Sequence, residues 1–192
     1  MLPNIIICGK MASGKTTIKD IIMKIYPEYI HMAFGQKVKD IAKDLFDMNV
    51  KNRDLLVKIG TSMREIDPDI WAKYLMKEIH KKSSACPVII DDLRYYNEYE
   101  VITKNTGEWF IINIEVSSKL QLKRLKETYP HNWEMHKKYI NHHSEKKHLK
   151  NINYDLIVDM DFYNKQSMDL DTFKSYFETI IRGELEKFMM LS

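Results

Sequence analysis

Apolar runs and amphipathic stretches alternate along the chain, and the first 25 residues set the pattern. Residues 2–8 are rich in β-branched isoleucine and end at a glycine, which predicts a strand buried on both faces. From Lys15 to Ile25, isoleucines recur every three to four residues, and Pro27 ends this helical pattern. Strand, glycine loop and helix in this order predict the opening of an α/β unit.

The alternation continues to the end of the chain. Four more short strands, each apolar in its centre, are predicted at residues 29–34, 86–92, 108–116 and 154–160. Helical periodicity covers residues 35–48, 53–67, 68–82, 95–103 and 168–189, and the helix at 68–82 is expected to start at Pro68. We therefore predict an α/β fold in three layers, with a mainly parallel five-stranded sheet between helices, and a single domain over residues 1–192.

Composition limits the function without naming it. The chain has 192 residues, 44% of them hydrophobic and 30% charged, with a formal net charge of +3. This charge gives nucleic-acid binding no support, so no nucleic-acid partner is expected. Cys8 and Cys86 lack metal-binding spacing and indicate reduced thiols. With no signal peptide and no long apolar segment, we expect a soluble cytosolic protein without a membrane partner.

The segment GKMASGKTT, Gly9 to Thr17, completes the pattern GxxxxGK[ST] between a predicted strand and a predicted helix. Its glycines allow backbone N–H groups to point at phosphate oxygens, and the following helix start adds partial positive charge. Lys15 is expected to reach the β- and γ-phosphates of ATP and Thr16 to bind Mg²⁺. The alternative is a glycine turn with no ligand. The expected nucleotide-binding residues are Gly9, Ala12, Ser13, Gly14, Lys15, Thr16 and Thr17.

A second polar cluster follows the strand at 86–92, in VIIDDLRYYNEYE. Ligands of parallel sheets bind at the carboxyl ends of strands, so Asp92 and Arg94 are expected in the same crevice as the phosphate loop. Asp92 is predicted to hold Mg²⁺ and Arg94 to pair with an acceptor phosphate. The alternative is a solvated surface Asp–Arg pair. No NKxD segment for guanine occurs, so phosphoryl transfer to a small acceptor is favoured over a GTPase switch.

Four segments follow the phosphate loop in a fixed order: AFGQKVKDIAKDLF, LLVKIGTSMREIDPDIWAKYL, VIIDDLRYYNEYE and HHSEKKHL. With them the chain resembles the deoxynucleoside monophosphate kinases of bacteriophages and large DNA viruses over nearly its whole length. The resemblance implies ATP- and Mg²⁺-dependent phosphorylation of a deoxynucleoside monophosphate, and a possible homodimer. Two departures fall near the acceptor pocket: Gly35-Gln36-Lys37 replaces a small residue followed by proline, and Tyr95-Tyr96 replaces an aromatic-proline pair.

The resemblance also assigns site residues. Lys39, Arg64 and Arg94 match basic positions around the acceptor phosphate, Asp92 matches the strand-end carboxylate, and Asn97 and Glu98 close the same loop. Arg53 is a further candidate. Phe34, Trp71, Tyr95 and Tyr96 are aromatic residues that could border the acceptor base, although core packing is their more common role. The predicted acceptor-binding residues are Lys39, Arg53, Arg64, Trp71, Arg94, Asn97 and Glu98.

The polar segment at about 117–150 occupies the place of a lid over the phosphates. Arg124 is its only arginine and is the expected catalytic lid residue, together with Lys15, Arg94 and Asp92; Lys123 and Lys126 are possible helpers. An exposed basic helix is the alternative. The five histidines of the segment lack the spacing of a zinc site, so no zinc site is predicted. They are His131, His136, His142, His143 and His148.

Two rival functions remain open on the sequence. A related P-loop kinase such as phosphomevalonate kinase shares the phosphate loop and a strand-end Asp-x-Arg. A non-enzymatic, nucleotide-dependent nucleic-acid-binding module would instead use the basic histidine-rich segment as its contact surface, and its nucleic-acid binding would weaken with salt.

Overall fold

The computed structural model describes residues 2–82, 86–131, 133–140 and 151–191. Its centre is a five-stranded sheet in the order β2-β3-β1-β4-β5, with every neighbouring pair parallel. The strands are β1 Asn4–Gly9, β2 Ile30–Met32, β3 Val88–Ile90, β4 Trp109–Glu115 and β5 Leu156–Asp159. The predicted α/β fold with five parallel strands is confirmed.

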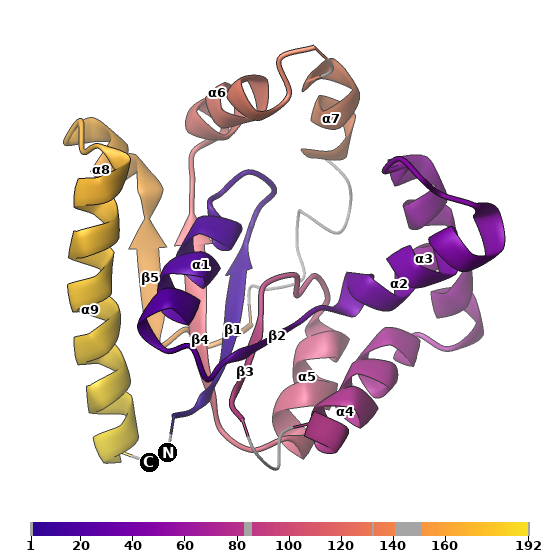
Figure 1. Ribbon diagram of the computed structural model, residues 1–192, viewed down its shortest axis with the longest axis horizontal. Helices are drawn as coiled ribbons and strands as arrows, with labels where there is room; N and C mark the ends of the chain where they lie inside the picture. Colours follow the sequence, from indigo (N-terminus) through magenta and orange to yellow (C-terminus); the bar gives the residue numbers. More distant parts are fainter. Residues whose placement is uncertain (1, 83–85, 132, 141–150, 192) are drawn as a thin grey trace.

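Helices cover both faces of the sheet (Figure 1). They are α1 Lys15–Ile25, α2 Phe34–Phe46, α3 Arg53–Ile66, α4 Ile70–Lys82, α5 Tyr96–Asn105, α6 Ser118–Thr128, α7 Trp133–Ile140, α8 Met160–Lys165 and α9 Leu170–Leu191. Among the described helices, none combines the length and the apolar character needed to cross a bilayer.

Strand β1 shows why the central strands are apolar throughout. Ile5 and Ile7 pack on the face covered by α1 and α9, whereas Ile6 and Cys8 pack on the face covered by α2, α4 and α5. Successive side chains of a strand point to opposite faces, so a strand covered on both sides needs apolar residues at every position. Burial raises the pKa of the Cys8 thiol to about 12, which keeps it a neutral core group.

Two boundaries differ from the sequence prediction. Helix α4 begins at Ile70 rather than at Pro68, because Asp67 closes a turn first: its Oδ1 accepts from the Asp69 N–H at 3.0 Å, and its carbonyl accepts from the Ile70 N–H at 3.0 Å. The closing helix predicted at 168–189 is α9, which the short helix α8 precedes. Ser167, between them, has φ 50°, a left-handed conformation that interrupts the helix.

The parallel strands all end at one edge of the sheet, which carries the phosphate loop after β1. Leu2 and Phe188, near the two ends of the chain, pack against the same apolar cluster, and both ends lie on the side of the sheet opposite the phosphate loop (Figure 1).

Candidate functional site

The phosphate loop joins β1 to α1 and has an unusual backbone. Gly9 and Gly14 have φ values of +150° and +108°, and Ala12 lies between them at +59°. A Cβ at Gly9 would stand 2.7 Å from the Ser13 Oγ and 2.9 Å from the Ile114 carbonyl. A side chain at this position would be strained, because the backbone conformation favours glycine and the Ile114 carbonyl stands too close to a Cβ.

Lys15, the first residue of α1, folds over its own loop. Its Nζ donates to the carbonyls of Gly9 at 2.7 Å and Lys10 at 2.6 Å. Burial, followed by the positive charge of Arg94, lowers the pKa of Lys15 to about 7. An incoming phosphate would offer this ammonium better acceptors than carbonyls and would favour its charged form.

Helix α6, the first part of the predicted lid, is hydrogen-bonded to the phosphate loop. Gln121, which is 1% exposed, donates from Nε2 to the Met11 carbonyl at 2.7 Å, and Arg124 donates from Nη1 to the Ser13 carbonyl at 2.7 Å. Leu120 and Leu125 are buried beside them. The first part of the predicted lid is therefore anchored, and Arg124 already contacts the loop instead of lying on a mobile segment.

The rest of the predicted lid is only partly described. Helix α7 contacts α3 through Lys138 Nζ and Asp54 Oδ1, 3.4 Å apart, and His136 stacks on Tyr129 with ring centroids 3.9 Å apart. Lys123 is exposed, and Lys126 lies over the Trp133 ring at 4.5 Å. The prediction for His142, His143 and His148 falls outside the described residues. Within the described ranges, no group of three metal-ligating side chains is present.

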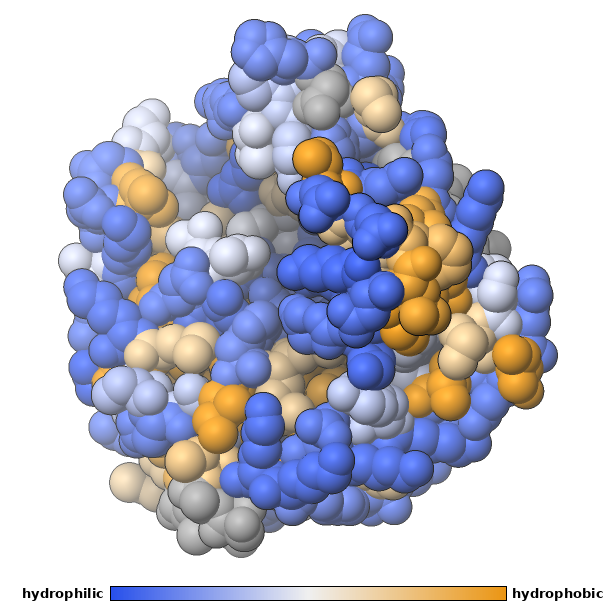
Figure 2. All heavy atoms as spheres, turned by 45° about the vertical axis from the view of Figure 1, so that its right-hand side comes forward, coloured by the Kyte–Doolittle hydropathy of each residue, from blue (hydrophilic) through white to orange (hydrophobic). Residues whose placement is uncertain are grey.

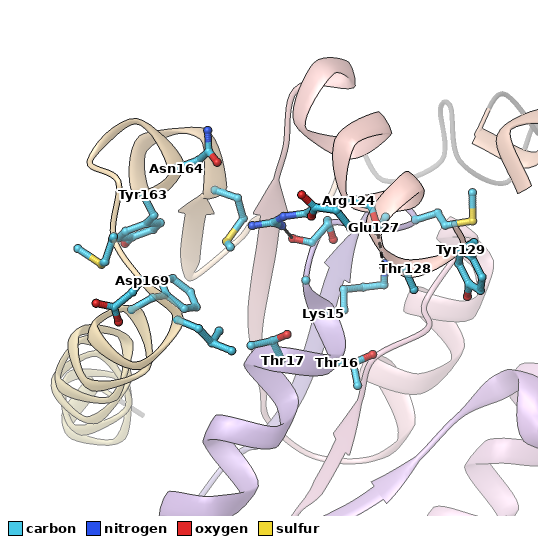
Figure 3. A pocket seen from close by; sticks show the side chains of 18 residues that line it. Lys15, Thr16, Thr17, Arg124, Glu127, Thr128, Tyr129, Tyr163, Asn164 and Asp169 are labelled. Atoms are coloured by element: carbon cyan, nitrogen blue, oxygen red, sulfur yellow. Dashed lines mark hydrogen bonds between the residues drawn. The ribbon is translucent and has the colours of Figure 1, made fainter. Parts of the chain in front are cut away.

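A cavity of about 570 Å³ opens beside the phosphate loop, and we call it the loop cavity (Figure 3). Lys15, Thr16 and Thr17 line it at the start of α1, and Arg124 projects into it from α6. The opposite wall was not predicted from the sequence, since it follows β5 and carries no motif. Its residues are Met160, Tyr163, Asn164, Met168, Asp169, Leu170 and Phe173.

A second cavity of about 250 Å³, the basic pocket, lies between α2, α3 and the loop after β3. It brings together four cationic side chains predicted from the sequence, which are Lys39, Arg53, Arg64 and Arg94. Figure 2 shows a hollow in this side of the molecule, bordered by hydrophilic side chains. Lys51, which sequence reasoning missed, belongs to the same positive region: burial lowers its pKa, and so do the charges of Arg53, Lys39 and Arg94.

The basic pocket holds positive charge that is shielded from water. Burial lowers the pKa of the Arg94 guanidinium, although the carboxylates of Asp92 and Glu98 oppose this shift. Cations held close together out of water repel one another and lack hydration. Such a site favours a ligand with more than one negative charge.

The two carboxylates after β3 have different partners, and Asp92, which is expected to hold Mg²⁺, is already engaged with the backbone. Asp92 accepts N–H bonds from Phe34 at 2.9 Å and Gly35 at 2.8 Å, so both of its oxygens hold the start of α2. Asp91 lies on the side of α1, where its Oδ1 is 2.7 Å from the His31 Nε2. Both residues lie just beyond β3, and their different hydrogen-bond partners distinguish the two side chains.

The electrostatics agree with this division. Asp91 opposes the lowering of the Lys15 pKa more strongly than Asp92 does. Burial alone would raise the pKa of Asp91, but its hydrogen bond with His31 and the charges of Lys19 and Lys15 lower it. Asp91 is therefore the strand-end carboxylate with the stronger electrostatic effect on Lys15, whereas Asp92 lines the basic pocket.

Two predicted acceptor residues are not among those that line the basic pocket. Trp71 is 2% exposed, and its Nε1 donates to the Gly60 carbonyl at 3.1 Å, so it packs beneath the pocket. Asn97 donates to the Pro68 carbonyl at 3.0 Å and to Asp69 Oδ1 at 2.8 Å, which fixes the turn before α4.

The remaining predicted aromatic residues divide between pocket and core. Phe34 and Tyr95 line the basic pocket, whereas Tyr96 packs on Tyr99 with ring centroids 5.7 Å apart.

Comparison with known proteins places this geometry in a family. A family model described as an AAA domain matches residues 5–148. Among solved structures, a gluconokinase from Sinorhizobium meliloti 1021 is similar, with a TM-score of 0.58 and 14% sequence identity over 99% of this chain and 97% of that chain. No curated protein matches the chain significantly. The chain belongs to the AAA domain family (AAA_18), and its fold is that of a P-loop kinase.

Proposed function

We propose that the protein is a deoxynucleoside monophosphate kinase that transfers the γ-phosphoryl group of ATP to a deoxynucleoside monophosphate. One observation carries the proposal: the loop cavity and the basic pocket adjoin, because Met11 lines both. Lys15 on the loop side and Arg94 on the pocket side also lie close enough for each charge to affect the other. A donor and an acceptor phosphate could therefore meet between them.

In this proposal the loop cavity takes ATP. Backbone N–H groups of the loop and Lys15 bind the β- and γ-phosphates, and the base extends toward Tyr163 and Asn164, across the cavity from the loop. Arg124, which already donates to the loop, stands on the wall beside the phosphates.

In this proposal Mg²⁺ binds at the phosphate end of the loop cavity, which Thr16 lines. The Thr16 hydroxyl and the Asp91 carboxylate supply hard oxygen ligands of the kind that Mg²⁺ prefers. When bound, Mg²⁺ neutralises charge on the transferred group.

The basic pocket takes the acceptor monophosphate. Arg94, Arg53, Arg64 and Lys39 hold its phosphate dianion, and an ionised acceptor oxygen attacks the γ-phosphorus. The new P–O bond forms as the bond to the β-phosphate oxygen breaks, and ADP leaves with that electron pair. No general base is needed, because the attacking oxygen carries no proton. Lys15 and the arginines offset the charge that spreads over the transferred group.

The cluster of cations in the basic pocket supports a phosphorylated acceptor over a sugar acid, because a phosphate dianion carries more negative charge than a single carboxylate. In keeping with the resemblance to phage and viral enzymes, we place the reaction in the supply of deoxynucleoside diphosphates for viral DNA synthesis. A phosphomevalonate-type kinase is the rival, since its acceptor is also a phosphomonoester.

The test is a coupled assay of ADP release with ATP and Mg²⁺. The acceptors are dAMP, dGMP, dCMP, dTMP, dUMP, the ribonucleotides, phosphomevalonate and gluconate. ADP release that depends on one or more deoxynucleotides supports the proposal. Release only with phosphomevalonate or gluconate moves the assignment to another small-molecule kinase. No stimulation by any acceptor, with salt-sensitive binding to DNA or RNA, would favour the nucleic-acid-binding module.

A further inference from the structure

Glu98 is a buried carboxylate whose two oxygens are both engaged. It is 1% exposed; its Oε1 accepts from Arg64 Nη2 at 2.9 Å, and its Oε2 accepts from the backbone N–H groups of Arg94 at 3.0 Å and Tyr95 at 3.1 Å. Burial raises the pKa of Glu98, while the hydrogen bond and charge of Arg64 oppose this shift. A carboxylate with this many donors is poorly suited to receive a ligand as well.

Arg64, the partner of Glu98, is restrained from three directions. Besides the bond to Glu98, its Nη1 donates to the Gly60 carbonyl at 3.2 Å, and its guanidinium lies 4.3 Å from the centroid of the Tyr95 ring. Tyr95 is itself held through its backbone N–H by Glu98. One carboxylate therefore fixes the guanidinium of Arg64 and the backbone on which the Arg94 side chain stands.

We propose that Glu98 is a positioning residue, which sets Arg64 and Arg94 in the geometry that binds the acceptor phosphate without contacting the acceptor itself. This inference rests on the proposed function and replaces the direct acceptor contact predicted from the sequence. Ordering the Arg64 side chain and the backbone that carries Arg94 before the ligand arrives removes an entropic cost from binding. Glu98 therefore acts on acceptor affinity and leaves the ATP site unaffected.

Glu98→Gln tests the inference with a side chain of the same shape. A glutamine has one carbonyl oxygen and one NH₂ group. If the oxygen faces Arg64, the NH₂ meets two backbone N–H donors; if it faces the backbone, the NH₂ meets the guanidinium. Either orientation loses a contact that the carboxylate makes. Glu100→Gln is the matched control, because Glu100 lies on the same helix and pairs with Lys104 on the surface, at 2.8 Å.

We expect Glu98→Gln to raise the acceptor KM by about 10- to 100-fold, the range for loss of a charged hydrogen bond, while the ATP KM stays within about twofold. Glu100→Gln should match the wild type. In an Arg64→Gln background, Glu98→Gln should raise the acceptor KM by clearly less than it does alone, because the Arg64 part of its effect is already lost. An unchanged acceptor KM, an equal loss for ATP and acceptor, or full additivity with Arg64→Gln would overturn the inference.

Glu98→Asp gives a second route if Glu98→Gln does not fold, since it keeps the charge but withdraws it by one methylene. It should also raise the acceptor KM, and wild-type values would refute the positioning role.

Titration calorimetry with inorganic phosphate, on Lys15→Ala protein, separates this inference from the proposed function. The Lys15→Ala change weakens phosphate binding at the loop, so the remaining heat reports on the basic pocket. Weaker phosphate binding after adding Glu98→Gln supports the inference even if no deoxynucleotide is phosphorylated. Unchanged binding, or no phosphate binding to the Lys15→Ala protein, overturns it.

Discussion

Gln121→Met should both destabilise the protein and weaken nucleotide binding, because Gln121 ties α6 to the phosphate loop. The amide is buried and donates to the Met11 carbonyl at 2.7 Å. Methionine has a similar length and volume but cannot donate, so the change removes the hydrogen bond with little change in packing. The Met11 carbonyl lies inside the loop that is proposed to hold the phosphates.

The size of the effect follows from burial. A buried carbonyl that loses its donor costs about 1–3 kcal/mol, because water cannot replace the lost partner without entering the core. The greater hydrophobicity of methionine offsets part of this cost, so we expect a net loss of about 1–2 kcal/mol in the free energy of unfolding. Gln121→Glu should cost more, since it places a carboxylate oxygen against the carbonyl.

Urea unfolding gives the free energy, and calorimetry with a non-hydrolysable ATP analogue gives the nucleotide affinity. Lys123→Met is the matched control, because Lys123 is exposed two residues further along α6. The control should leave both quantities unchanged, and Gln121→Met should lower both. If Gln121→Met unfolds like the control, α6 behaves as part of a loosely attached lid and the anchoring argument fails.

Three further predictions concern charge in the site. Burial lowers the pKa of Lys15 to about 7, so above pH 7 the binding of an ATP analogue must take up a proton, and its affinity should fall by up to about tenfold per pH unit. Lys15→Ala should abolish this slope. A flat wild-type profile, at pH values where the nucleotide stays fully ionised, would contradict the reasoning. Arg94→Ala should raise the acceptor KM at least about tenfold, with ATP affinity little changed. Because the charge of Arg94 lowers the pKa of Lys15, the same change should move the pH profile of Lys15 to higher pH. An equal loss for both substrates would remove the acceptor role of Arg94. Asp91→Asn should raise the Mg²⁺ concentration needed for half-maximal turnover, whereas Asp92→Asn should not; the reverse result would restore Asp92 as the metal carboxylate.

The sequence predicts the fold well because apolar runs and glycine are local signals. The strand before Gly9 and the helix after Gly14 could be placed without tertiary information, and the other four strands follow from short apolar runs. The boundary at Ile70 could not, because it depends on a side-chain turn at Asp67 that competes with the favourable position of Pro68.

The division of roles within the site depends on the direction of each side chain. Asp91 and Asp92 are chemically identical neighbours, and only their different partners in the folded chain, His31 and the start of α2, distinguish them. Trp71 resembles a base-stacking residue until its burial under Gly60 is known. Gln121 lies in a polar segment with weak periodicity, so its buried bond to Met11 left no sequence signal.

The position of the two chain ends suits the protein to immobilisation, to fusion with another protein and to circular permutation. Both ends lie together near the edge of the sheet opposite the phosphate loop (Figure 1). A surface tether or a fused fluorescent protein at either end would therefore leave both cavities open to diffusing molecules. A short linker could also join the two ends, with new ends opened at Gly107, where even an added Cβ would meet nothing within 4 Å. Such a circular permutant would keep the phosphate loop and the basic pocket on uninterrupted chain.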